Sequence, residues 1–115
     1  MDIEAVYRRG FDLRCEGRYA EATIEFKKVL ATDPRHCESR WQLALIQGFQ
    51  GDFEGSLAML QELSRDYPDN LHVRYDLAMT QMMLGMVDEA CAEFREVLRR
   101  DPNHENAKKQ LAYCV

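Results

Sequence analysis

A histidine and an aspartate one helical turn apart are the first residues in this sequence whose types could support catalysis. His72 and Asp76 lie four positions apart, and on a helix such a carboxylate can orient an imidazole as a general base. The sequence offers no nucleophile, phosphate-binding loop or metal-ligating cluster to accompany the pair. A short motif of this kind often matches by chance. We therefore expect a solvated or ion-paired His–Asp pair, no enzyme activity and no cofactor.

Cysteine is the second residue type that could do chemistry, and the chain has four: Cys15, Cys37, Cys91 and Cys114. Their separations of 22, 54 and 23 residues match no CxxC-type zinc site. The first four residues are acidic in character and lack the charged start and apolar stretch of a signal peptide. We therefore expect a cytoplasmic protein whose cysteines are small buried side chains or thiols.

Composition excludes two classes of partner. The net charge is -5, and the basic residues occur singly or in pairs, whereas nucleic-acid binders cluster lysine and arginine against phosphates. No apolar run approaches the roughly 20 residues that a membrane-spanning helix needs. We expect no binding to nucleic acid and no membrane insertion.

The chain is organised as a repeat with a period of 34 residues. Glycine recurs at 17, 51 and 85, and proline recurs at 34, 68 and 102. Small residues recur at two further offsets, and large apolar residues recur between them. The small sets are Gly10, Ala44 and Ala78, and Ala22, Ser56 and Ala90; the large sets are Phe26, Leu60 and Phe94, and Val29, Leu63 and Val97. Self-similarity at this period indicates a solenoid of stacked helix pairs.

Apolar spacing within each period predicts two helices, separated by the glycine and ended by the proline. The expected helices cover about 3–15, 19–31, 37–49, 53–65, 71–83, 87–100 and 105–115. The small residues are expected where the two helices of a pair cross closely. The last helix is half a repeat, and we interpret it as a cap over the exposed apolar end of the stack.

These features resemble the tetratricopeptide repeat family over nearly the whole chain. The resemblance implies an all-α, right-handed solenoid that forms a single domain, with repeats at 3–36, 37–70 and 71–104 and a capping helix at 105–115. It also implies that the first helices of the repeats line a concave groove, whose polar residues include Arg14. Family members that hold a peptide's terminal carboxylate use lysine and asparagine. The matching positions here are Tyr7, Phe11, Gln42, His72 and Asp76, so we expect no carboxylate clamp.

Apolar side chains occupy the expected groove instead. Phe11, Leu45 and Met79 recur 34 residues apart, and Phe49, Met82 and Met83 extend the set. Methionine suits adaptable binding surfaces because its unbranched thioether repacks around different partners. Three aromatic residues, Tyr7, Trp41 and Tyr75, either contact ligand or pack between adjacent helices.

We therefore predict a non-enzymatic adaptor or scaffold that binds an apolar or amphipathic segment of a partner protein in its groove. The alternative is a structural module that joins copies of itself into homo-oligomers, through the apolar surface or through the end of the cap at 113–115. An enzyme centred on His72 is a third, weaker hypothesis.

Overall fold

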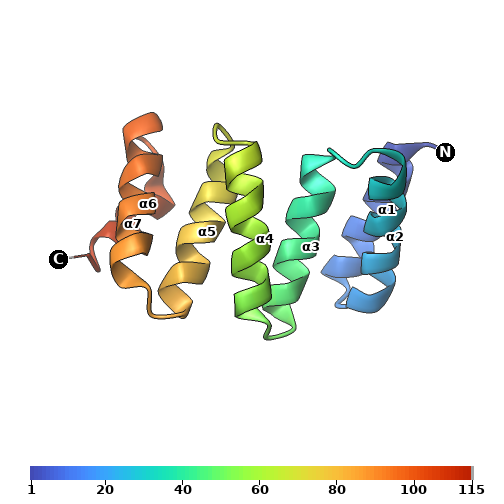
Figure 1. The fold of residues 1–115 in the computed structure, drawn as a ribbon, viewed down its shortest axis with the longest axis horizontal. Helices are drawn as coiled ribbons and strands as arrows, with labels where there is room; N and C mark the ends of the chain where they lie inside the picture. The colour runs from blue at the N-terminus through green and yellow to red at the C-terminus, as the bar shows by residue number, and fades with distance from the viewer. Residues whose placement is uncertain (115) are drawn as a thin grey trace. The chain divides into compact units, whose positions relative to one another are not determined.

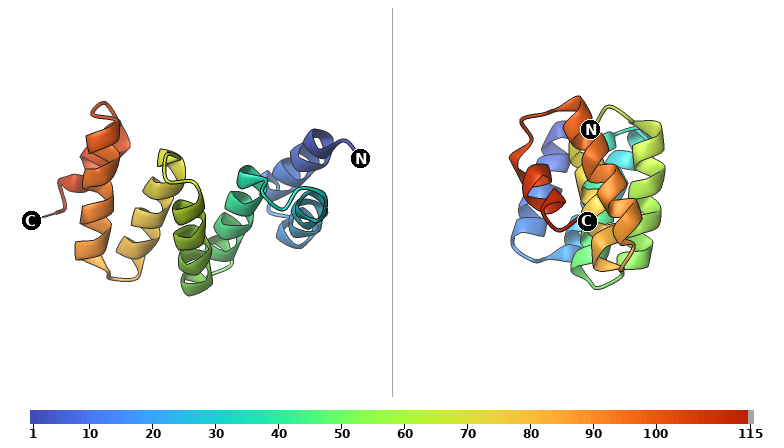
Figure 2. Two further views of the ribbon diagram at one scale, coloured as in Figure 1. Left: turned by 45° about the horizontal axis from the view of Figure 1, so that its top comes forward. Right: turned by 90° about the vertical axis from the view of Figure 1, so that its left-hand side faces the viewer.

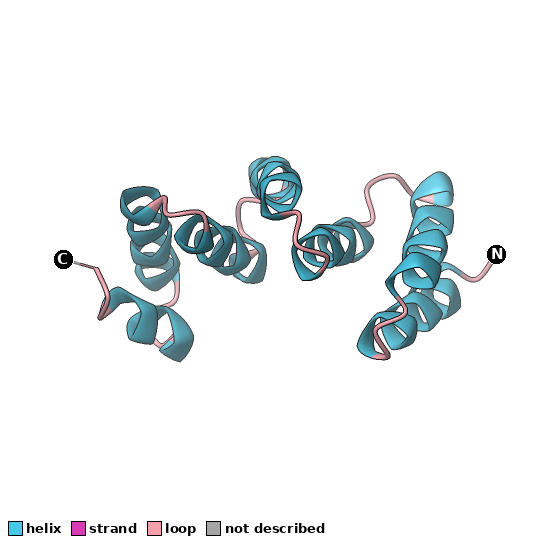
Figure 3. Cartoon of the chain, turned by 90° about the horizontal axis from the view of Figure 1, so that it is seen from below, coloured by secondary structure: helices cyan, strands magenta, loops and turns pink. Residues whose placement is uncertain are grey.

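The computed structural model describes residues 1–114, and all regular secondary structure in that range is helical (Figures 1 and 3). The helices are α1 (Ile3–Cys15), α2 (Tyr19–Thr32), α3 (Cys37–Phe49), α4 (Phe53–Asp66), α5 (Leu71–Met83), α6 (Val87–Arg100) and α7 (Glu105–Leu111). The predicted all-α class is confirmed. The first six helices agree with the predicted bounds to within one residue.

Glycine ends α1 by the mechanism that the sequence predicted. Gly17 has a φ of +78°, a left-handed conformation that glycine adopts without a Cβ penalty. The amide of Gly17 donates to the carbonyl of Arg14 (2.9 Å), and the amide of Arg18 donates to that of Leu13 (2.9 Å). These two hydrogen bonds satisfy carbonyls that the end of the helix would otherwise leave unpaired.

Histidine begins two of the helices. His36 precedes α3, and its Nδ1 accepts a hydrogen bond from the amide of Ser39 (3.2 Å). His104 precedes α7 and accepts in the same way from the amide of Ala107 (3.1 Å). These ring nitrogens satisfy amides that have no partner within the helix. Both histidines are therefore helix caps rather than candidates for catalysis.

The chain forms two compact units, and the boundary between them in the sequence lies between residues 52 and 53. The first unit contains α1, α2 and α3, and the second contains α4 to α7. The boundary falls between the two helices of the predicted second repeat. The division into three repeats and a cap within one domain stays a prediction.

In the first unit, α1 and α2 lie side by side and α3 packs against both (Figure 1). Ala22, Phe26 and Ile46 form its buried core. A Cβ added to Gly10 would lie 2.8 Å from Cε1 of Phe26, closer than carbon atoms approach. This contact confirms that a small residue is required where α1 crosses α2.

In the second unit, α5 packs between α4 and α6, and α7 covers α6 (Figure 2). The buried core of this unit is made of Ala78, Ala90, Phe94, Val97 and Ala107. Ala107 comes from α7 and is completely buried. α7 therefore covers apolar surface of the second unit.

The capping helix is shorter than predicted. The expected helix ran to Val115, but α7 ends at Leu111, and Val115 lies outside the described residues. The amides of Tyr113 and Cys114 each donate to a carbonyl three residues earlier, at 3.0 Å, so the chain turns instead of continuing as a helix. Such i to i−3 bonds commonly tighten and end a helix.

A disulfide joins the turn after α7 to α6. Cys114 is bonded to Cys91, with the two Cα atoms 5.9 Å apart. The prediction that all four cysteines are buried hydrophobes or thiols is therefore wrong for this pair. Cys15 and Cys37 remain thiols, and Cys15 is exposed. Cys114 lies beyond the end of α7 at Leu111.

Candidate functional site

An arginine stacked on two aromatic rings is the most distinctive surface feature of the first unit. The Arg14 guanidinium carbon lies 5.0 Å from the centre of the Phe11 ring and 5.6 Å from that of Phe49. Phe49 is 52% exposed although it is a large apolar residue, and Tyr19 stacks on it at 5.8 Å. We call Phe11, Arg14 and Phe49 together the Phe11–Phe49 surface. Both phenylalanines were predicted groove residues, and they lie together here.

A shallow hollow borders this surface. It has a volume of about 260 Å³ and is lined by Tyr7, Arg8, Phe11 and Asp12 of α1. Apolar ring faces and charged groups therefore meet within one helix face. This combination suits an amphipathic ligand better than a purely apolar one.

Two of the three predicted aromatics pack inside their own units. Tyr7 lies 5.6 Å from Phe26 and 5.4 Å from His36, measured between ring centres. Tyr75 makes the equivalent contacts in the second unit, 5.6 Å from Phe94 and 5.2 Å from His104. Burial raises the pKa of the Tyr7 hydroxyl. Each of these tyrosines therefore joins a first helix to the second helix and to the histidine cap.

The remaining predicted groove residues differ in how far they reach solvent. Trp41 and Leu45 are half-buried on α3. Met79 and Met82 on α5 pack partly against the core of the second unit. Met83 is 62% exposed. In the second unit, Met83 is thus the predicted residue with the most surface to offer a partner.

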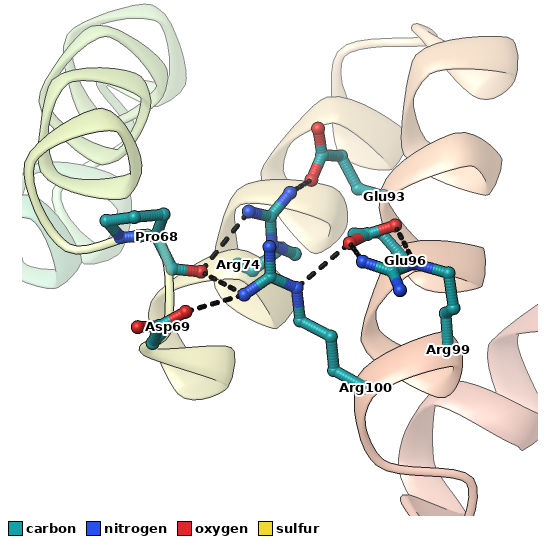
Figure 4. A network of polar contacts seen from close by, with 7 residues as sticks. All are labelled: Pro68, Asp69, Arg74, Glu93, Glu96, Arg99 and Arg100. Atoms are coloured by element: carbon teal, nitrogen blue, oxygen red, sulfur yellow. Dashed lines mark hydrogen bonds and ion pairs between the residues drawn. The ribbon is translucent and has the colours of Figure 1, made fainter.

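The second unit has a larger hollow built around another arginine, Arg74. Its volume is about 460 Å³, and it is lined by Gln61, Ser64, Arg65, Pro68, Arg74, Leu77, Gln81 and Glu93. Nη1 of Arg74 donates to Glu93 of α6 (2.8 Å), and Nη2 donates to the carbonyl of Pro68 (3.3 Å; Figure 4). These bonds hold the turn after α4 against α5 and α6.

The turn is held by a second arginine as well. Nη1 of Arg100 donates to the Pro68 carbonyl (3.3 Å) and to Asp69 (2.7 Å), and its Nε donates to Glu96 (2.9 Å; Figure 4). Hydrogen bonds from Arg99 and Arg100 lower the pKa of Glu96 from 4.5 to about 2. This network has a structural role, since its carboxylates are all paired with arginines, although Nε of Arg74 is buried without a hydrogen-bond partner.

Neither a metal centre nor a membrane-spanning segment emerges from the described residues. Between residues 1 and 114, histidine, cysteine and carboxylate side chains do not gather in threes that could hold a metal ion. None of α1 to α7 has the length and apolar character needed to cross a membrane.

The sequence matches a family model described as tetratricopeptide repeat over residues 50–114, which is more than half of the chain. Among curated proteins, Superkiller complex protein 3 of Mus musculus is 24% identical over 107 residues. Tetratricopeptide repeat protein 37 of Xenopus laevis is 23% identical over the same length. Each match covers 93% of this chain but only 7% of the relative. The chain therefore spans a small part of these proteins.

Solved structures share the fold. A MamA structure from Desulfovibrio magneticus RS-1 superposes with a TM-score of 0.82 at 20% identity, over 97% of this chain and 63% of that one. A tetratricopeptide repeat protein from Parabacteroides merdae gives a TM-score of 0.80 at 19% identity, over 91% of this chain and 42% of that one. At these identities the likeness concerns the fold alone, and it confirms the predicted helical solenoid class.

Proposed function

The chain belongs to the tetratricopeptide repeat family, and on that premise we propose that it is a non-enzymatic adaptor that binds an apolar or amphipathic segment of a partner protein. The fold itself supports protein–protein interaction. The Phe11–Phe49 surface is the observation that carries the finer proposal, because it gathers aromatic side chains of two first helices at a point open to solvent. Exposed apolar side chains gathered in this way usually mark an interface.

Aromatic residues suit this role energetically. Phenylalanine carries a large apolar area on a side chain with few rotamers, so little conformational entropy is lost when a partner covers it. The second unit has an exposed, flexible apolar side chain of its own in Met83. A partner segment that is apolar on one side and polar on the other would bury the rings and keep its own polar groups in water.

The test is the replacement of Phe49 by glutamate. In the free protein the new carboxylate would lie at the surface beside Arg14, so Phe49→Glu should melt within a few degrees of the wild type. In the complex the same carboxylate would lose its water against an apolar partner, at a cost of several kcal/mol. That cost is enough to abolish a micromolar interaction.

Ile24 provides a matched control, because it is 55% exposed on α2, outside the Phe11–Phe49 surface. Pull-downs from native lysate, quantified by mass spectrometry, should show the same partners for wild type and Ile24→Glu and their loss for Phe49→Glu. Retention of every partner by both variants would place the binding surface elsewhere. Leu45→Glu is a second test on α3, at a half-buried position where the charge is expected to cost more stability.

Self-association is a second candidate, and one observation favours it. Tyr113 is 74% exposed in the turn after α7, beside the disulfide. An aromatic side chain there could pack against a second copy of the chain. Light scattering across a dilution series would show a falling mass for the wild type and a constant monomer mass for Tyr113→Ser. A constant monomer mass for the wild type would refute this alternative.

A further inference from the structure

We infer that Arg14 is a recognition site for the side-chain carboxylate of a glutamate or aspartate within the bound partner segment. This inference rests on the proposed function, and it specifies the chemistry of the ligand. It follows from the absence of an ion-pair partner for Arg14 among the described residues and from the way the guanidinium is held.

Arg14 differs from Arg9 and Arg18 in having no carboxylate partner among the described residues. Arg9 pairs with Glu25 (3.3 Å), and Arg18 pairs with Glu16 and Glu21. Within residues 1–114, Arg14 forms no ion pair, and its hydrogen bonding is limited to a long contact from Nη2 to Sγ of Cys15 (3.9 Å). A half-buried guanidinium without a counter-ion leaves strong donors available to a ligand.

The two aromatic rings hold this guanidinium in a fixed place. A guanidinium over a ring face is attracted by the ring's electron density. The N–H groups point outward in the plane of the guanidinium, so contact with a ring face does not block their hydrogen bonds. Nε is buried without a hydrogen-bond partner, whereas Nη1 is not enclosed. The open end of the fork therefore suits a carboxylate that accepts from the terminal nitrogens.

The charges around the hollow are mixed. Its lining contributes Arg8 and Asp12, and Glu38 and Glu4 add to the effect of burial in raising the pKa of Tyr7, which also lines it. Arg8, like Arg14, has no ion-pair partner in the part of the chain that the structure describes. A carboxylate would therefore be drawn to the Arg14 guanidinium itself and not to a positive surface as a whole.

The two rings beside Arg14 favour one kind of carboxylate. Phe11 and Phe49 both contact the guanidinium, which lies 5.0 and 5.6 Å from their ring centres. An internal glutamate or aspartate has neighbours on both sides of it in the chain that can cover the rings, whereas a chain-terminal carboxylate has neighbours on one side only. Arg14 is also distinct from the clamp positions, which hold Tyr7 and Phe11 on this helix.

The experiment uses three synthetic peptides and the full chain. The first is Ser-Leu-Phe-Glu-Leu-Phe-Ser with an acetylated N-terminus and an amidated C-terminus. The second replaces its glutamate by glutamine, and the third is the glutamine peptide with a free terminal carboxylate. Each is titrated into ¹⁵N-labelled protein while the Nε–H signal of Arg14 and the backbone signals of α1 are followed by NMR.

We expect the glutamate peptide to bind the wild type about tenfold more tightly than the capped glutamine peptide. The preference should disappear in Arg14→Gln and persist in Arg9→Gln, a matched loss of one charge on the same helix. Raising sodium chloride from about 50 mM to about 500 mM should reduce the preference, because the charges are partly exposed.

The alternative outcomes separate the two proposals. Equal affinity for the two capped peptides would overturn the role of Arg14 and leave the peptide-binding function standing. Tightest binding by the free-terminus peptide, lost in Arg14→Gln, would show that the site takes a terminal carboxylate instead. Failure of all three peptides to bind would count against both proposals. If Arg14→Gln does not fold, Arg14→Lys keeps the charge without the planar fork and should show a reduced preference.

Discussion

Arg14 and Arg74 are half-buried arginines on first helices, one in each compact unit, and they are held by different chemistry. Arg74 donates to Glu93 on the next helix and to the Pro68 carbonyl. Arg14 lies over the rings of Phe11 and Phe49 and has no carboxylate partner among the described residues. The degree of burial does not distinguish them, but their partners do.

The difference separates a structural arginine from one available for binding. An ion pair between helices satisfies the charge and fixes the turn that precedes α5. Aromatic stacking fixes the position of the guanidinium but leaves most of its hydrogen-bond donors without acceptors. Each prediction below would strengthen or remove this contrast between the two units.

The largest expected effect concerns the disulfide, which is confined to the second unit. It closes a loop of 23 residues, and such a cross-link stabilises by about 3 kcal/mol, mainly by restricting the unfolded chain. The double variant Cys91→Ala/Cys114→Ala should therefore lose about that much free energy of unfolding. Hydrogen exchange should locate the loss in α6 and α7. If amide protection fell equally in α1, the disulfide would not stabilise the second unit selectively.

The helix crossings should behave alike in both units. Ala22 and Ala90 are completely buried at equivalent repeat positions. Replacing either by leucine should cost about 2 kcal/mol, because the extra methyl groups force the paired helices apart. Urea titrations of Ala22→Leu and Ala90→Leu are compared with Lys27→Gln, an exposed control on α2. A wild-type midpoint for either leucine variant would contradict the assigned helix face.

The two arginines themselves should differ in their effect on stability. Arg74→Gln leaves the Glu93 carboxylate and the Pro68 carbonyl without their donor, at a cost of about 1–2 kcal/mol for a partly buried pair. Arg14→Gln removes only ring contacts and should cost less than about 1 kcal/mol. Urea unfolding of the two variants measures the free energy of unfolding that each has lost. A larger loss for Arg14→Gln than for Arg74→Gln would reverse the assignment of roles.

The smallest effect is the acid response of the second unit. The folded-state pKa of Glu96 is about 2, below its ordinary value of 4.5. Its contribution to stability is therefore present above about pH 4.5 and is lost as the pH falls toward 2. Urea midpoints measured across this range should fall less steeply for Glu96→Gln than for the wild type. Asp88→Asn, on the same helix, is the control and should follow the wild type.

The fold was predictable because each helix boundary has a local cause in the sequence. Glycines with φ near +80° end α1 and α5, and prolines follow α2, α4 and α6. The small residues at the helix crossings repeat at a fixed period, so their common role was visible from spacing alone. The predicted groove residues occupy the expected helices, and their contact with a ligand stays a prediction.

The disulfide and the roles of the two arginines depend on contacts that no local pattern records. The cap was expected to continue to the end of the chain, and its early turn places Cys114 against Cys91. Glu93 reaches back 19 residues to Arg74, a separation at which helix periodicity indicates no pairing. Arg14 was placed on the groove by the family resemblance. Its stacking depends on Phe49, which is distant in sequence.

The disulfide also changes how the second unit would carry mechanical load. Tension on the backbone beyond residue 114 would pass through the sulfur bridge into α6 at Cys91, leaving the segment 92–113 outside the loaded path. The short helix α7 would then be shielded from pulling, and α6 would resist first. Reduction of the bond would place α7, with its seven residues, at the point where the force enters.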